Sequence, residues 1–155
     1  MPRLRPADTG KRQAGGRNAR RRAREYAVQG LYQWLLSRAD LGVVLAGLAE
    51  SPGYEKCDTR HLAGLIGGVM STHEELNAML APHLDRKLEH VSPVEHAILL
   101  VGTYEMRHHP EIPYRVVINE AIDLAKVFGG NDGFRFVNGI LDRVATDSGV
   151  NQGRR

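Results

Sequence analysis

The sequence predicts an all-α protein that folds as a single compact domain of about six to seven helices. Apolar residues recur at helical three- and four-residue spacing in successive segments, and no stretch sustains the two-residue alternation of a strand. Recognisable helix starts and stops separate these segments, and no internal repeat is visible. With 155 residues, the chain is long enough to bury about 68–70% of its unfolded surface around one core.

The first helix is expected over residues 17–38, where the densest positive charge of the chain meets a clear amphipathic pattern. At about 100° per residue, one face carries the apolar side chains of Val28, Leu31, Tyr32 and Leu35. The same stripe continues towards the N-terminus as Arg17, Arg21 and Arg24. Three arginines on a core-facing stripe cannot all be buried without partners, so the first turns should overhang the body or extend their charged heads into water.

Two further helices follow, each preceded by an aspartate. Asp40 can cap a short helix that runs to about Glu50, where Ser-Pro-Gly at residues 51–53 stops it. Asp58 can cap a longer helix that continues until Pro82. The apolar residues of this longer helix keep helical spacing throughout, which indicates a core element.

The strongest helix start is Ser-Pro-Val-Glu at residues 92–95, a capping box with proline at the first helical position. This helix should run to about His108, and because it is apolar almost all round we expect it to be central. Glu105 shares a face with apolar residues and needs a partner if it is buried. We favour a structural ion pair over a catalytic acid, because no second carboxylate or histidine sits at a spacing that would share a site.

The last two helices are expected after Pro113 and after Asp132, which can cap the final one; Gly129-Gly130 separates them. Phe136 lies at the margin of the final helix's apolar stripe, next to Arg135. Its ring can pack on a neighbouring element, which periodicity favours, or stack on a nucleic-acid base.

The positive charge is concentrated at one end of the chain. Residues 1–24 carry nine Arg and Lys against Asp8 alone, a local charge of +8, so the remainder must carry −5 to give the total of +3. Residues 1–16, with their prolines and glycines, are expected to form a flexible basic arm, and residues 147–155 a disordered tail. The helical domain should therefore span residues 17–146.

The chain shows no pattern typical of an enzyme, a metal centre or a cofactor site. No two histidines stand four residues apart, and the glycine-rich residues 129–133 lack the Lys-Ser/Thr of a phosphate-binding loop. The single Cys57 excludes an internal disulfide and fits a reducing, cytoplasmic setting. No run reaches the roughly 18 apolar residues of a membrane span, and no signal-peptide core follows the N-terminal arginines.

Three stretches of the sequence together resemble the NusB family. The first is Ala-Arg-Arg-Arg-Ala-Arg-Glu at residues 19–25, leading into Gln-Gly-Leu-Tyr at 29–32. The second is PYRVVINEAIDLAK at residues 113–126, and the third is FVNGILD at 136–142. The two C-terminal stretches occur in order and at the family's spacing. The resemblance covers approximately residues 19–145, with residues 41–57 matching weakly and an N-terminal arm longer than the family's.

This resemblance implies two packed helical subdomains without catalytic activity. It also implies a heterodimer with NusE, a small-subunit ribosomal protein, that recognises single-stranded boxA RNA and helps the RNA polymerase elongation complex to read through terminators. The RNA-binding residues predicted in this way, together with Arg17 on the same stripe, are Arg20, Arg21, Arg22, Arg24, Asp132, Arg135 and Phe136. The resemblance associates Tyr32 and Glu95 with the partner surface.

Two interpretations from different classes stay open at this stage. The first is an RNA-binding transcription antitermination factor. The second is a helical scaffold in small-subunit ribosome assembly, whose arginines meet only acidic protein surfaces. The sequence also leaves open whether the free protein is a monomer or a homodimer.

Overall fold

The computed structural model describes residues 16–130 and 132–150, with residues 16 and 17 described by their backbone alone. Six α-helices occur in this part of the chain: α1 (Gly16–Ser37), α2 (Leu41–Ala49), α3 (Thr59–Leu80), α4 (Pro93–His108), α5 (Tyr114–Phe128) and α6 (Gly133–Ser148). Short 3-10 turns occur at η1 (Tyr54–Lys56), η2 (Ala81–His83) and η3 (Leu88–His90). No strand occurs in the described residues, which confirms the predicted all-α class.

The predicted helix starts differ in how they are capped. The Asp58 side chain accepts a hydrogen bond from the backbone N–H of His61 at 3.0 Å, and Ser92 accepts one from Glu95 at 3.2 Å. Asp40 and Asp132 stand at the N-cap positions of α2 and α6, but neither side chain makes a capping bond. The carboxylate of Asp132 is therefore left for other partners.

Helix α4 lies at the centre, as its composition predicts. It contacts α1, α3, α5 and α6, and every residue from Ala97 to Thr103 is buried. One continuous core cluster connects residues of all six α-helices. The central position of α4 means that Glu105 near its C-terminal end is enclosed by other helices.

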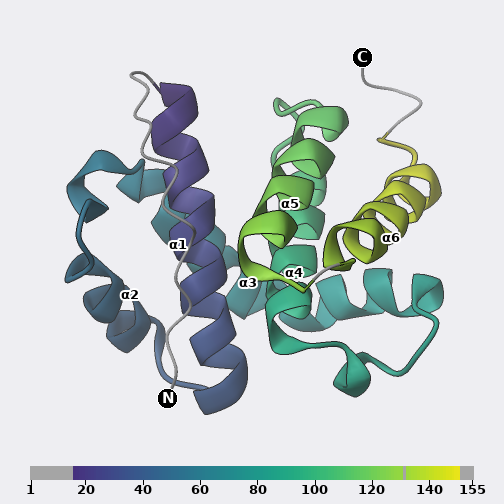
Figure 1. Cartoon of the computed structure of the whole chain (residues 1–155), viewed down its shortest axis with the longest axis horizontal. Helices are drawn as coiled ribbons and strands as arrows, with labels where there is room; N and C mark the ends of the chain where they lie inside the picture. Colours follow the sequence, from purple (N-terminus) through teal and green to yellow (C-terminus); the bar gives the residue numbers. More distant parts are fainter. Residues whose placement is uncertain (1–15, 131, 151–155) are drawn as a thin grey trace.

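Helix α3 links the two sides of the molecule because it bends. Thr72 has non-helical dihedrals (φ −123°, ψ 17°), and the hydroxyls of Ser71 and Thr72 both donate to the carbonyl of Gly68. Such bonds to the preceding turn are a known cause of helix bending. The first half of α3 packs with α1 and α2, and its second half runs beneath α4 and α6 (Figure 1). These are the two packed subdomains that the family resemblance implies.

The helical domain ends slightly later than the sequence suggests. Helix α6 continues to Ser148, two residues past the expected boundary, and Gly149 ends it in the left-handed conformation (φ +80°) that suits glycine. The predicted arm over residues 1–16 lies outside the described residues except for Gly16, as do residues 151–155 of the predicted tail. In the described part of the chain, no helix combines the length and hydrophobicity that a membrane span requires.

Candidate nucleic-acid interface

The first turns of α1 point successive arginines in different directions, because consecutive helical residues are about 100° apart. The Arg20 guanidinium lies 3.7 Å from the Asp58 carboxylate at the start of α3, and its side chain is 38% exposed. Arg22 is half-buried beside Gly53, and within residues 18–130 and 132–150 it makes no ion pair. The side chain of Arg17 lies outside the described residues. Arg20 and Arg22 are thus held weakly or not at all by the chain's own carboxylates.

Arg21 turns towards α5 and is held by two carboxylates. Its Nε and Nη2 donate to the two carboxylate oxygens of Glu120 at 3.1 and 2.7 Å, and Nη2 also donates to Asp123 at 3.2 Å. The hydrogen bond to Glu120 raises the pKa of Arg21. The Arg21 side chain stays 40% exposed, so one edge of the guanidinium remains open to solvent.

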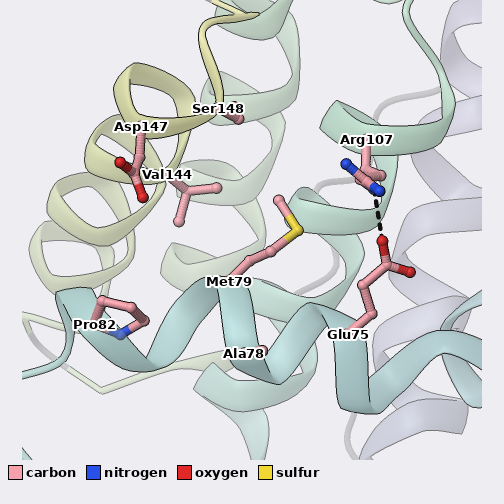
Figure 2. Close-up of a pocket in the computed structure, with 8 residues that line it drawn as sticks. All are labelled: Glu75, Ala78, Met79, Pro82, Arg107, Val144, Asp147 and Ser148. Carbon is pink, nitrogen blue, oxygen red and sulfur yellow. Dashed lines mark ion pairs between the residues drawn. The ribbon is translucent and has the colours of Figure 1, made fainter.

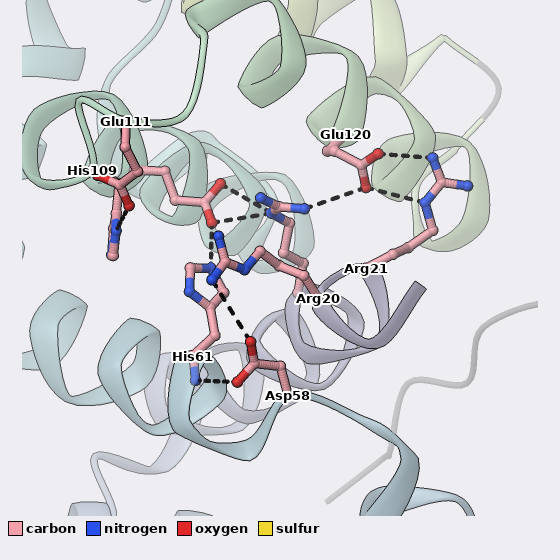
Figure 3. A network of polar contacts seen from close by, with 9 residues as sticks. Arg20, Arg21, Asp58, His61, His109, Glu111 and Glu120 are labelled. Carbon is pink, nitrogen blue, oxygen red and sulfur yellow. Dashed lines mark hydrogen bonds and ion pairs between the residues drawn. The ribbon is translucent and has the colours of Figure 1, made fainter. Parts of the chain in front are cut away.

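Arg24 is buried and bonded to Glu105. Figure 3 shows the neighbouring side chains of Arg21, His61 and Glu120. Its Nε lies 3.0 Å from both carboxylate oxygens of Glu105, and its Nη1 lies 3.6 Å from Glu120. His61 adds a 2.7 Å contact from Nε2 to Glu105. Burial raises the pKa of Glu105, but the hydrogen bond from His61 and the charge of Arg24 outweigh it and hold the pKa below its ordinary value.

This network bears on two sequence-based expectations. Arg24, which the family resemblance associates with RNA, is 5% exposed and bonded to carboxylates, so contact with a phosphate would require it to break these bonds. The structural ion pair expected for Glu105 is present. Sequence spacing gave no indication of its partners, because Arg24 and His61 are 81 and 44 residues away along the chain.

The start of α6 presents a second charged and aromatic group. Asp132 and Arg135 are 80% and 75% exposed and lie 3.4 Å apart, an arrangement that holds neither side chain firmly. Two cations lie close to the Phe134 ring centre, the Lys126 ammonium at 5.1 Å and the Arg135 guanidinium at 5.3 Å. Lys126 therefore belongs to this surface, although sequence reasoning did not single it out.

Phe136 packs partly against the core, as periodicity favours, but its ring is also covered from outside. The guanidinium carbon of Arg86 lies 4.7 Å from the ring centre, within cation–π range. Arg86 comes from the connection between α3 and α4, and no pattern in the sequence marks it.

The two groups of predicted RNA-binding residues are separated rather than side by side. Helix α5 lies between α1 and α6 (Figure 1). Arg21 joins α1 to Glu120 and Asp123 of α5, and Lys126 joins the same helix to Phe134 of α6. Any ligand that touches both groups must therefore extend along α5, as a strand of nucleic acid does.

The two residues associated with a partner surface lie on different helices. The Glu95 carboxylate sits against the first residue of α6, where a Cβ on Gly133 would lie only 2.7 Å from its Oε2. Gly133 therefore lets the carboxylate approach the helix start, where the dipole favours negative charge. Tyr32 is half-buried on α1, eleven residues after Arg21.

A cavity of about 480 Å³ lies away from these groups, at the C-terminal end of α6 (Figure 2). Met79 and Val144 contribute apolar surface, and Arg107 pairs with Glu75 at 2.7 Å. In the described residues, no group of three or more His, Cys, Asp or Glu side chains is placed to hold a metal ion.

The fold and this surface together define an all-helical protein with a basic helix end and cation-flanked phenylalanines. Residues 21–146 match the model of the NusB family. The chain belongs to the NusB family of transcription antitermination proteins. The family assignment confirms the expectation that the chain is not an enzyme.

Individual relatives agree with this assignment. The chain is 52% identical to the transcription antitermination protein NusB of Paraburkholderia phymatum over 136 residues, covering 88% of this chain and 94% of the relative. It is 53% identical to that of Burkholderia cenocepacia over 129 residues, covering 83% and 89%. The solved structure of T. maritima NusB superposes with a TM-score of 0.74 at 30% identity, covering 82% of this chain and 90% of that one.

Proposed function

We propose that this chain, together with NusE, binds the single-stranded boxA element of ribosomal RNA leaders and promotes read-through by the RNA polymerase elongation complex. Family membership supports the antitermination role. The observation that carries the RNA-binding part is that Arg20 and Arg22 lack strong carboxylate partners, while Arg135 and Phe136 stand beyond α5.

The proposed contacts follow from how proteins hold single-stranded RNA. Arginines track the phosphates, and aromatic rings stack on unpaired bases. We assign the phosphate contacts to Arg17, Arg20, Arg22, the open edge of Arg21, and Arg135. The strand then continues past the phenylalanines at the start of α6. Arg24 supports this surface from beneath by fixing α1 to α4.

We place NusE on the surface that carries Tyr32 and Glu95. A chain with few exposed rings has modest affinity for bases, so the bound partner completes the groove and adds discrimination.

Because transcription and ribosomal RNA synthesis occur in the bacterial cytoplasm, we place the protein there. The lone Cys57 accords with this setting.

One observation favours a second candidate, the helical scaffold without direct RNA contact. Arg20, Arg21 and Arg24 all meet carboxylates of the chain itself. A guanidinium pairs with a carboxylate as well as with a phosphate, so the exposed edges of Arg20 and Arg21 suit an acidic protein surface equally. The two functions differ in how binding responds to salt.

A salt titration with boxA RNA, in the presence of NusE, separates them. Each neutralised phosphate of a single strand contributes about −0.7 to the slope of log K against log [salt]. Replacing Arg20 and Arg22 by alanine should therefore flatten the slope by about 1.4. Arg107→Ala, which removes an exposed arginine at the distant cavity, is the matched control. If the wild type, Arg20→Ala/Arg22→Ala and Arg107→Ala all give the same salt slope, the scaffold is favoured.

A further inference from the structure

The connection between α3 and α4 is attached to α6 by contacts of its own. The Arg143 guanidinium of α6 donates to the carbonyl of His83 at 3.3 Å, and the His83 ring lies 3.4 Å from Asp147. Leu84 packs against the core. The segment that carries Arg86 is therefore attached to α6 on the face that also bears Phe136, seven residues before Arg143.

Arg86 covers the Phe136 ring and stays accessible at the same time. Its guanidinium carbon is 4.7 Å from the ring centre, and its side chain is 41% exposed. Asp85 accepts from Nε at 2.7 Å and from Nη2 at 3.3 Å, so the carboxylate orients the guanidinium by two bonds. Asp85 itself is 72% exposed, and exposed pairs of this kind are easily broken.

These contacts change which group an approaching base meets first. A base that stacked directly on the outer face of Phe136 would have to displace Arg86. A guanidinium is planar, stacks on aromatic faces, and keeps N–H groups free to donate at its edges. An arginine already resting on a phenylalanine therefore offers a base a flat, cationic platform.

We propose that Arg86 is a further RNA-contacting residue, and that an unpaired base stacks on its guanidinium above Phe136. This inference rests on the proposed RNA-binding function and adds the α3–α4 connection to the interface. The ligand class is a single-stranded RNA with one splayed base at the start of α6. The strand then passes from α1 along α5 to a platform built by two separate segments of the chain.

The test compares variants at position 86 in titrations with boxA RNA, alone and with NusE. Arg86→Ala should weaken binding by about 5- to 150-fold, the range for losing one stacked base. Arg86→Lys keeps the positive charge but lacks the planar guanidinium on which a base would stack, so it should weaken binding nearly as much. Arg107→Ala, an arginine in an equally short exposed carboxylate pair, should leave the affinity unchanged.

A series of RNAs with single abasic sites locates the base. At one position, removal of the base should abolish the difference between the wild-type protein and Arg86→Ala. Phe136→Leu should weaken binding, and combining it with Arg86→Ala should add little, because both residues serve one platform. Thermal melts of each variant confirm that the fold is kept.

Two results would overturn the inference. If Arg86→Lys binds as tightly as the wild type, the residue contacts only a phosphate. If Arg86→Ala behaves like Arg107→Ala, Arg86 does not touch RNA. In either case, the proposed function would still stand if the Arg20→Ala/Arg22→Ala protein loses RNA binding. The proposed function itself would fail if the wild-type protein does not bind the RNA.

Discussion

Replacing Arg24 by methionine should destabilise the protein strongly without weakening its contact with RNA. The substitution keeps a similar side-chain length but leaves the Glu105 carboxylate, 1% exposed, without its cationic partner. Removing one member of a buried ion pair costs about 3–5 kcal/mol, because the remaining charge is left buried and poorly compensated. His61 stays in contact with Glu105, which places the expected loss at the lower end of this range.

The loss is large on the scale of the whole fold. Domains of this kind are stable by about 5–15 kcal/mol, and in a domain of about 150 residues each kcal/mol moves Tm by about 2–4 °C. Arg24→Met should therefore lower Tm by about 6–12 °C if the loss is about 3 kcal/mol. Urea unfolding followed by circular dichroism gives the free energy independently.

Two controls accompany this prediction. Arg107→Ala breaks an exposed pair with Glu75 and should cost no more than about 1 kcal/mol. The double variant Arg24→Met/Glu105→Leu replaces both charges by apolar groups and should recover most of the lost stability. A cost below about 1 kcal/mol for Arg24→Met would contradict the structural role of this pair. So would a folded variant that loses RNA affinity as Arg20→Ala/Arg22→Ala does.

Three further predictions follow from individual contacts. Asp132→Asn should strengthen RNA binding, because it removes a carboxylate that repels phosphate and frees Arg135; a titration showing equal or weaker binding argues against placing this turn beside RNA. Because the folded-state pKa of Glu105 is lowered, its contribution to stability is complete above the unfolded pKa of about 4.3 and fades as pH falls through the folded value. The Tm difference between wild type and Glu105→Gln should thus shrink below that pH, and a constant difference contradicts the assignment. Gly68→Ala should destabilise the fold by about 1–3 kcal/mol in urea unfolding, because the added Cβ would overlap the Tyr104 ring; an unchanged midpoint would show that the ring moves away freely.

Local signals in the sequence predict the helices well. The capping box at Ser92 and the apolar run behind it place α4 and its central position, because both signals act within one helix. The sequence also places Arg21 and Arg24 on the same helical stripe as the buried Leu31, and both arginines turn towards other helices of the fold. Periodicity cannot identify a partner on another helix. Arg24 can be buried because it bonds to Glu105, which lies 81 residues away along the chain.

The site illustrates the same limit. The NusB-like stretches contain Arg20, Arg22, Arg135 and Phe136, so the resemblance brings these residues into view. Arg86 lies in the connection between two helices, 50 residues before the ring it covers, and its neighbours follow no helical period. Which arginines remain available is equally a property of the packed structure, since it depends on where Asp58, Glu105 and Glu120 come to lie.

The most direct test of the central claim is the affinity of the full-length protein for NusE, measured with and without boxA RNA. If the α1 arginines and the start of α6 bind RNA jointly with NusE, the RNA should raise the affinity for NusE. By linkage, NusE should raise the affinity for RNA by the same factor. Arg20→Ala/Arg22→Ala should reduce that factor, and Arg107→Ala should not. An affinity for NusE that is identical with and without boxA RNA would contradict the account.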